Sequence, residues 1–191
     1  MRSAFVPLAI AGSLLALPLV PSKACAEPYI GASLGIADQQ LICAAGAPCD
    51  RRAPTGRLTA GWHFSERFGA ELAWSGNLSD FTASDSLANL TWQGSFRVQA
   101  LSASASWTLD AGPLDLQLRA GVASVRGVFH SRTAGVTDSK DTRTRPLFGA
   151  GLRRSFNEHW TLRADADLTD GQAFTRKGHH TTFTVGIERR F

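Results

Sequence analysis

The stretch that decides the fold is the end of the chain, His180–Phe191, "HTTFTVGIERRF". Apolar side chains recur there at every second position, at Phe183, Val185 and Ile187. A period of two places apolar and polar side chains on opposite faces of a β-strand. Chain ends are usually polar and frayed, whereas this one ends on the aromatic Phe191. The pattern predicts a strand that closes a larger sheet.

The same alternation recurs along the chain. Each stretch carries Leu, Ile, Ala or aromatic residues on one face and Gly, Ser, Thr or charged residues on the other. Helical spacing fits none of them as well. The eight stretches are residues 29–37, 56–64, 68–74, 100–109, 113–122, 147–156, 160–168 and 180–191.

The connections between these stretches alternate between short and long. The short ones are residues 65–67, 110–112 and 157–159, and the long polar ones are roughly 38–55, 76–97, 124–145 and 169–180. Short turns at one end and long loops at the other are typical of outer-membrane barrels, and an even strand number puts both termini at the short-turn end. The predicted fold class is all-β, an eight-stranded antiparallel up-and-down transmembrane β-barrel.

A soluble eight-stranded barrel is the alternative, with its apolar face inside and its polar face in water. A solvated surface normally carries many Lys and Glu, but the only lysines after residue 26, Lys140 and Lys177, lie in predicted loops. Aromatic residues also stand at the ends of the apolar stripes, as in the interfacial girdles of membrane barrels. They are Phe64, Phe68, Trp74, Trp107, Phe156, Trp160 and Phe191.

Residues 1–26 have the pattern of a secretory signal peptide. Arg2 precedes the apolar run "AFVPLAIAGSLLALPLV", and "ACA" at Ala24–Ala26 is an A-x-A cleavage site. A transmembrane anchor fits less well, because Pro7 and Pro18 interrupt the run. We therefore expect a cleaved signal at 1–26 and a barrel domain at 27–191.

The charge of the chain excludes a nucleic-acid footprint. Of the 20 Lys and Arg residues, Arg2 and Lys23 lie in the signal, which leaves 18 against 16 Asp and Glu and a net charge of +2. We expect no nucleic-acid partner.

Two cysteines remain after the signal, Cys43 and Cys49 in "CAAGAPC". Export to an oxidising compartment favours a disulfide between them. A metal pair is the alternative, but only Asp50 is adjacent as a further ligand. We predict a structural disulfide in the first long loop.

Three stretches resemble the OmpA-type family of small outer-membrane barrels: "TGRLTAGWHFSERFGAELAW" (55–74), "FGAGLRRSFNEHWTLRADADL" (148–168) and "VGIERRF" (185–191). The first is similar to that family's second hairpin and the second to its sixth and seventh strands. The resemblance implies a location in the outer membrane of a Gram-negative envelope. It also implies that the barrel-assembly machinery reads Phe191 as an insertion signal. Full-length OmpA proteins continue into a peptidoglycan-binding domain, and we expect no such cell-wall tether here.

The predicted inward faces collect charges of both signs. An eight-stranded barrel is only wide enough for its own side chains, and buried charges need partners, for which the arginine fork suits carboxylates. We predict an ion-pair network that plugs the lumen, with a gated pore or proton path as the alternative. The network residues are Glu71, Asp115, Arg119, Arg153, Arg163, Asp165, Asp167, Glu188 and Arg190.

An enzyme must be weighed, because some small outer-membrane barrels modify lipid A. Such chemistry needs a nucleophile beside a base. His130 and Ser131 are consecutive and would point to opposite sides of an extended segment, and His179–His180 lacks further ligands at metal spacing. We interpret His63 as a polar filler of the lumen. We predict no catalytic residue, no metal and no cofactor.

The long loops and adjoining strand ends are basic, with Arg51, Arg52, Arg57, Arg97, Arg126, Arg132, Lys140, Arg143, Arg145, Arg176 and Lys177. Arginine binds phosphate in a bidentate manner. We predict that Arg143, Arg145 and Arg176 face lipopolysaccharide and bind its phosphates. Ordinary solvated loop charge is the alternative.

Three classes of function follow. The first is a structural barrel that supports the envelope or presents its loops to surface ligands. The second is a surface adhesin or resistance factor, and the least favoured is a lipid-modifying enzyme or a soluble periplasmic binding barrel. Outer-membrane lipid, lipopolysaccharide and the assembly machinery are the expected partners.

Overall fold

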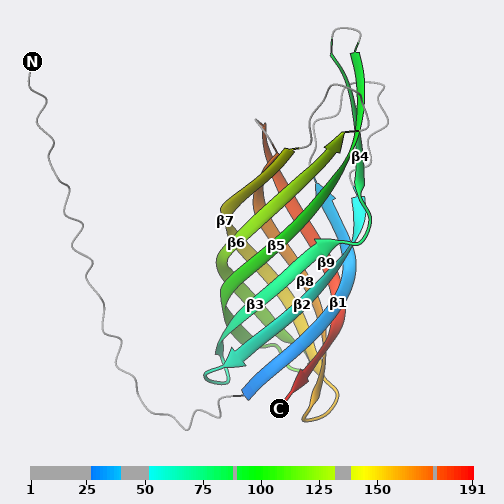
Figure 1. The fold of residues 1–191 in the computed structure, drawn as a ribbon. Coiled ribbons are helices and arrows are strands. Elements are labelled where there is room, and N and C mark those ends of the chain that lie inside the picture. The colour runs from blue at the N-terminus through cyan, green and yellow to red at the C-terminus, as the bar shows by residue number, and fades with distance from the viewer. Residues whose placement is uncertain (1–26, 40–51, 88–89, 132–138, 174–175) are drawn as a thin grey trace, which may run out of the picture.

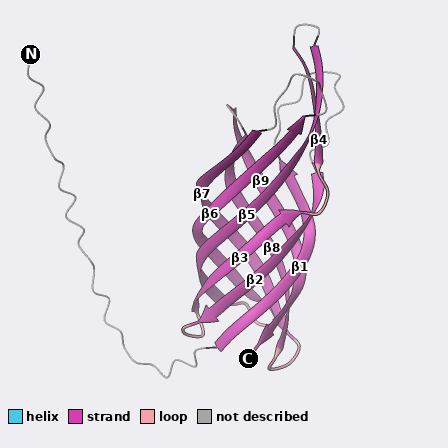
Figure 2. Ribbon diagram, in the orientation of Figure 1, coloured by secondary structure: helices cyan, strands magenta, loops and turns pink. Residues whose placement is uncertain are grey.

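The computed structural model describes residues 27–39, 52–87, 90–131, 139–173 and 176–191, which form strands and short turns (Figure 2). The strands are β1 (Glu27–Gln39), β2 (Arg52–His63), β3 (Phe68–Asn77), β4 (Phe81–Leu87), β5 (Leu90–Asp110), β6 (Asp115–Ser131), β7 (Ser139–Ser155), β8 (Trp160–Ala173) and β9 (Arg176–Arg190). Within these ranges no helix is long and apolar enough to span a membrane.

Eight of the nine strands close into an antiparallel barrel in the order β3-β2-β1-β9-β8-β7-β6-β5, and pairing between β5 and β3 completes the circle. The strand β4 follows β3 after a break at 78–80 and pairs with the first part of β5. These two strands form a hairpin that rises beyond the rest of the barrel (Figure 1). The predicted eight-stranded fold is confirmed.

The terminal strand has the role that its alternation predicts. The first strand, β1, pairs with β9 from Tyr29 opposite Arg190 to Gln39 opposite His180, and with β2 on its other side. The first and last strands are therefore neighbours. Closure removes the open edges whose unpaired backbone groups lipid cannot satisfy.

The barrel has two distinct ends. The turns at 64–67, 111–114 and 156–159 lie at one end, together with the start of β1 and the chain's C-terminus (Figure 1). We call it the short-turn end and the opposite one the long-loop end.

The outer wall is apolar, which is the reverse of a soluble barrel. Large hydrophobic side chains project outward from every strand of the barrel. A continuous apolar surface of this kind belongs in lipid. Its members include Ile30, Leu34, Leu58, Trp62, Leu72, Leu101, Val122, Phe148, Leu152, Leu168, Phe183, Val185 and Ile187.

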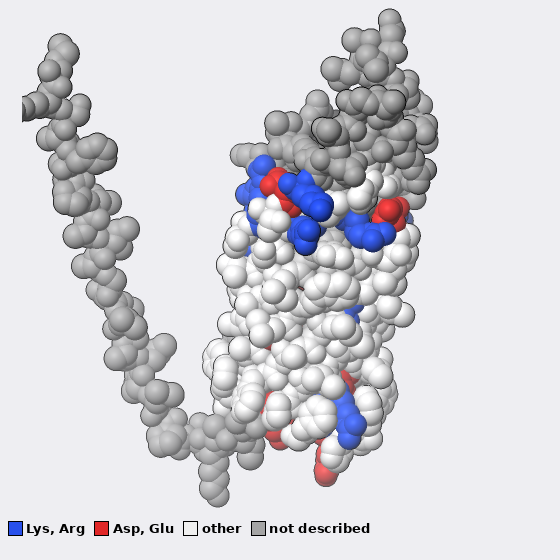
Figure 3. All heavy atoms as spheres, viewed as in Figure 1, with Lys and Arg blue, Asp and Glu red and all other residues white. Residues whose placement is uncertain are grey.

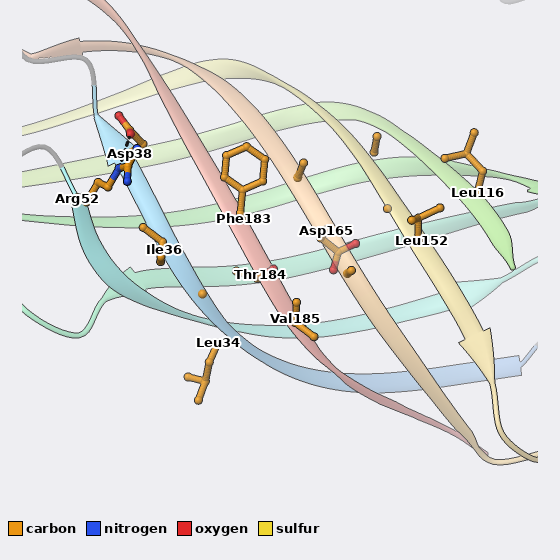
Figure 4. A pocket seen from close by; sticks show the side chains of 15 residues that line it. Leu34, Ile36, Asp38, Arg52, Leu116, Leu152, Asp165, Phe183, Thr184 and Val185 are labelled. Carbon is orange, nitrogen blue, oxygen red and sulfur yellow. Dashed lines mark hydrogen bonds and ion pairs between the residues drawn. The ribbon is translucent and has the colours of Figure 1, made fainter.

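The outer wall also carries a shallow hollow on neighbouring strands (Figure 4). Leu34 and Phe183 border it on β1 and β9, Leu152 borders it on β7, and alanines on β7 and β8 lie between them. Arg52 and Asp38 form an ion pair, 3.2 Å from Nε to Oδ2, at its long-loop side. The hollow has the apolar lining that lipid chains fill.

The predicted long connections are wrong in extent, because most of 76–97, 124–145 and 169–180 and both ends of 38–55 are strand. β5 is 21 residues long and β6 and β7 are 17, whereas about 9–11 residues cross the bilayer. Beyond Val122 the apolar side of β6 changes: Ala123 and Val125 face inward, and Ser124 and Arg126 face outward. β6 therefore continues past the apolar band with the polarity of a soluble barrel.

A small apolar cluster fills the inside of this outer segment. Ala37, Ala53 and Val98 are buried together, and Val125 packs against them. The lumen thus has an apolar layer toward the long-loop end and, as described next, a charged layer in its middle.

Candidate functional site

Arg163, on β8, lies at the centre of the lumen and is only 1% exposed. Its guanidinium donates to Glu71 Oε2 on β3 at 2.9 Å and to Asp165 Oδ2 on β8 at 2.7 Å. It also donates to Glu188 Oε2 on β9 at 3.4 Å. One arginine therefore joins three carboxylates from three strands.

Two further arginines complete a closed ring. Arg119 Nη1 lies 2.5 Å from Asp165 Oδ1, and its Nη2 lies 2.8 Å from Asp167 Oδ1. Arg57 Nη2 lies 2.6 Å from Glu71 Oε1, and its Nη1 pairs with Asp167. Arginines and carboxylates alternate around this lumen ring, whose members in order are Arg57, Asp167, Arg119, Asp165, Arg163 and Glu71.

A branch leads from the ring toward the short-turn end. Glu188 accepts from Arg163 and pairs with Arg153, whose Nη1 lies 3.2 Å from His63 Nε2. His63 stacks on Tyr29 with ring centroids 4.9 Å apart, and the Tyr29 hydroxyl donates to Glu71 at 3.0 Å. Four arginines meet four carboxylates across ring and branch, so this layer is close to neutral.

The structure brings together most of the predicted lumen residues. Glu71, Asp165, Asp167 and Glu188 pair with Arg119, Arg153 and Arg163 as described above. Arg190 lies at the margin, 3.8 Å from Glu188 and hydrogen-bonded to Ser155 and Thr161. Asp115 is half-buried at the start of β6 and takes no part in the ring.

Arg57 and Tyr29 are not among the predicted lumen residues. The sequence places Arg57 at the basic loop end, but it is buried in the ring, so that prediction is wrong. Tyr29 has no predicted role. The signal was present for both, because Leu58 and Ile30 face outward and their neighbours at odd positions must face inward.

Two glycines of β7 give the ring its space. Gly149 pairs with Arg119 and Asp167, and Gly151 pairs with Asp165. A Cβ at Gly149 would overlap the Asp167 carboxylate and lie 3.1 Å from Arg119 Nε. A Cβ at Gly151 would overlap the Asp165 carboxylate. β7 therefore approaches the ring with bare backbone.

The predicted lipopolysaccharide rim has a different orientation from that expected. Arg143 and Arg145 lie on the same, inward side of β7 as the buried Leu147, and both are half-buried near the long-loop end. Arg143 Nε pairs with Asp141 Oδ2 at 2.7 Å. Arg176 opens β9 opposite Ala173, and its side chain lies outside the described part of the chain.

Other cations face outward at the long-loop end. Arg126 on β6 lies opposite Thr142, and Lys140 on β7 lies opposite Val128, which makes the two exposed cations diagonal neighbours. On the face shown in Figure 3, Lys and Arg gather toward the long-loop end, one smaller basic patch lies near the short-turn end, and the wall between them is nearly uncharged.

The remaining predicted residues lie elsewhere. His130 is exposed on β6, and His179 and His180 lie on β9 opposite Asp170 and Thr169. Cys43 and Cys49 lie outside the described residues. Phe191 is exposed on the outer wall of the short-turn end, and its backbone N–H donates to Pro28 O at 3.1 Å.

Residues 8–191 match the family model of the outer membrane protein beta-barrel domain. The chain belongs to this family, and the protein is an integral barrel of the bacterial outer membrane, as the sequence predicts. In such barrels short turns face the periplasm and longer loops face outward. No curated protein sequence matches the chain.

Solved structures of small outer-membrane barrels share the fold. Neisserial surface protein A is 16% identical with a TM-score of 0.63, covering 86% of this chain and 97% of its own. Ail of Yersinia pestis, solved with the heparin analogue sucrose octasulfate, is 14% identical with a TM-score of 0.57, covering 87% and 99%. OprG of Pseudomonas aeruginosa is 12% identical with a TM-score of 0.59, covering 88% and 97%.

Proposed function

We propose that the protein is a non-conducting barrel that supports the envelope and presents its long-loop end to molecules at the cell surface. The observation that carries the proposal is the lumen ring. Its ion pairs join strands across the barrel and engage both carboxylate oxygens of Glu71, Asp165 and Asp167. An eight-stranded barrel has no room for an aqueous path beside such a layer.

Planar-bilayer recordings test the closed lumen. The parent protein is expected to show no stable open channel, whereas Arg163→Ala removes the residue that joins three carboxylates and is expected to admit brief, small conductance steps. Ser104→Ala, a change at a buried lumen position outside the ring, is the matched control and should stay silent. Stable, large-conductance openings of the parent would overturn the proposal.

A role in envelope integrity is tested in cells. A strain that lacks the gene is expected to be more sensitive to detergent than the parent strain, and a plasmid copy should restore resistance. Equal sensitivity of the two strains would leave surface binding as the role to pursue.

Lipopolysaccharide is the surface partner that the charges favour. Arg126 and Lys140 project outward at the long-loop end, and neither forms an ion pair with a described acid. Diagonal neighbours on adjacent strands lie about 7–8 Å apart, which lets both cations reach one phosphate group. These two residues replace the half-buried Arg143 and Arg145 as the leading candidates.

Co-purification of lipopolysaccharide tests this contact. Arg126→Gln/Lys140→Gln is expected to carry several-fold less lipopolysaccharide than the parent, and Arg67→Gln, which removes an exposed charge from the short-turn end, should match the parent. If Arg143→Gln/Arg145→Gln carries less lipopolysaccharide instead, Arg143 and Arg145 are the binding residues, as the sequence predicts. Equal amounts on all variants would mean that these charges are only solvated.

A surface adhesin or resistance factor is the second candidate. The projecting β4–β5 hairpin and the outward cations favour it. The Ail complex contains a polyanion, and a basic long-loop end suits a ligand of the same charge. Binding of intact cells to immobilised heparin, lost in Arg126→Gln/Lys140→Gln and weakened by salt, would support it; equal binding by a strain without the gene would contradict it.

We infer no enzymatic role. The three carboxylates of the ring are held by arginines, whose positive charge makes them weaker general bases. A lipid A profile from cells with and without the gene tests this inference, and a change in acyl chains would overturn it.

A further inference from the structure

Arg189 is held between two aromatic rings on the outer wall of the short-turn end. Its guanidinium carbon lies 5.8 Å from the centre of the Trp160 ring and 5.1 Å from that of Phe191. Both distances are within the range of cation–π attraction. The arginine is therefore fixed at the aromatic girdle, with its donors still available.

Arg154 projects from the same wall on the other side of β8. Arg154 on β7 lies opposite Leu162, and Arg189 on β9 lies opposite Trp160. Two strand spacings and a two-residue shift separate their α-carbons by about 12 Å. Two long arginine side chains that flank one strand in this way can converge on a single headgroup.

These two arginines lack the acidic partners that other arginines on the outer wall have. Arg52 pairs with Asp38 and Arg97 pairs with Asp80. Neither Arg154 nor Arg189 forms an ion pair with any described acid, including Glu158 in the adjacent turn. Two uncompensated positive charges therefore face the headgroup region of the periplasmic leaflet.

We propose that Arg154 and Arg189 bind the phosphate of an anionic glycerophospholipid in the periplasmic leaflet. Guanidinium groups bind phosphate through paired N–H donors, and basic sites on membrane proteins recognise anionic headgroups. Leu162 and Ile187, both exposed on the outer wall, lie opposite each other, two residues farther from the short-turn end than Trp160 and Arg189. These two apolar side chains contact the acyl chains of the lipid. Lipopolysaccharide is not the occupant, because it lies in the opposite leaflet.

Native mass spectrometry of the refolded full barrel tests the proposal, with phosphatidylglycerol and phosphatidylcholine as probes. The parent is expected to retain one phosphatidylglycerol in preference to phosphatidylcholine. Arg154→Gln/Arg189→Gln should lower that retention at least fivefold, to the level of phosphatidylcholine. The control, Arg67→Gln, removes an exposed charge from a different turn at the same end and should bind phosphatidylglycerol like the parent.

Equal retention by the parent and the Arg154→Gln/Arg189→Gln variant, or no preference of the parent for phosphatidylglycerol, would overturn the site. A gel-mobility shift on heating verifies that each variant is folded. If the double variant does not fold, Arg154→Gln and Arg189→Gln are measured singly, and each should give an intermediate loss. The site requires neither the closed lumen nor the lipopolysaccharide contact, so the tests of those functions fail or succeed separately.

Discussion

Arg163 on β8 and Glu71 on β3 come from diametrically opposite strands, and Arg163 Nη2 donates to Glu71 Oε2 at 2.9 Å. Four strand positions separate β8 from β3 in either direction around the barrel. A single ion pair therefore spans the full width of the lumen. This is possible because the interior of an eight-stranded barrel is only as wide as the side chains that fill it.

Replacing Arg163 by alanine is expected to destabilise the barrel strongly. The change leaves Glu71, Asp165 and Glu188 with fewer partners in a buried site, and removing one partner of a buried pair typically costs about 3–5 kcal/mol. Urea unfolding of the protein in lipid vesicles, followed by tryptophan fluorescence, measures the loss. Arg126→Ala, on the outer surface, should change the free energy of unfolding by less than about 0.5 kcal/mol. Equal effects of the two changes would show that the ring adds no stability.

Replacing Gly149 by alanine tests whether β7 must lack a side chain where it faces the lumen ring. The new Cβ would displace the Asp167 carboxylate from Arg119 and Arg57, and overpacking of this kind costs about 1–3 kcal/mol. Gly56→Ala is the matched control, because a Cβ there lies at an ordinary 3.4 Å from Leu78 on the outer wall. Urea unfolding in lipid vesicles measures both variants. Equal free energies of unfolding for Gly149→Ala and Gly56→Ala would show that the lumen ring rearranges with no loss of stability.

The membrane-level part of the fold could be predicted because lipid enforces a strict pattern. Outward side chains must be apolar, so the eight alternating stretches and the closing pair β1–β9 are readable from the sequence. Beyond the bilayer this constraint ends. Ala123 and Val125 face inward there while Arg126 faces outward. The outward face of the strand is now polar, so the apolar outward stripe ends and the segment has the sequence pattern of a polar loop.

Side-chain alternation also explains which charges the sequence could assign to the lumen. Asp165 and Asp167 lie inside stretches whose outward face is unmistakable, so their inward position follows. Arg143 and Arg145 lie four and two residues before Leu147, on the inward side of β7, but the sequence pattern predicts a loop for their segment. The partners within the ring could not be read from the sequence, because they depend on how eight strands close around one axis.

A disulfide between Cys43 and Cys49 remains a prediction from export and close spacing. Mass spectrometry of protein taken from the envelope should find neither thiol available for alkylation before reduction, and both available after it. Cys43→Ser/Cys49→Ser is expected to unfold almost like the parent, because the barrel pairing of β1 with β2 and β9 does not depend on that loop. Two free thiols in the native protein would reject the bond.

Phe191 is expected to act during insertion more than in the stability of the finished barrel. Its side chain is 61% exposed on the outer wall and stacks on Arg189, so alanine forfeits only part of the roughly 1.5–3 kcal/mol of a full burial. The backbone bond from Phe191 to Pro28 O does not involve the side chain and is available to alanine. Phe191→Ala should therefore lower the amount of barrel in the outer membrane while the inserted fraction unfolds at nearly the parent urea concentration. Phe156→Ala, an exposed aromatic in a turn at the same end, controls for loss of an interfacial ring. Equal envelope levels for Phe191→Ala and the parent would show that the terminal aromatic is not needed for assembly.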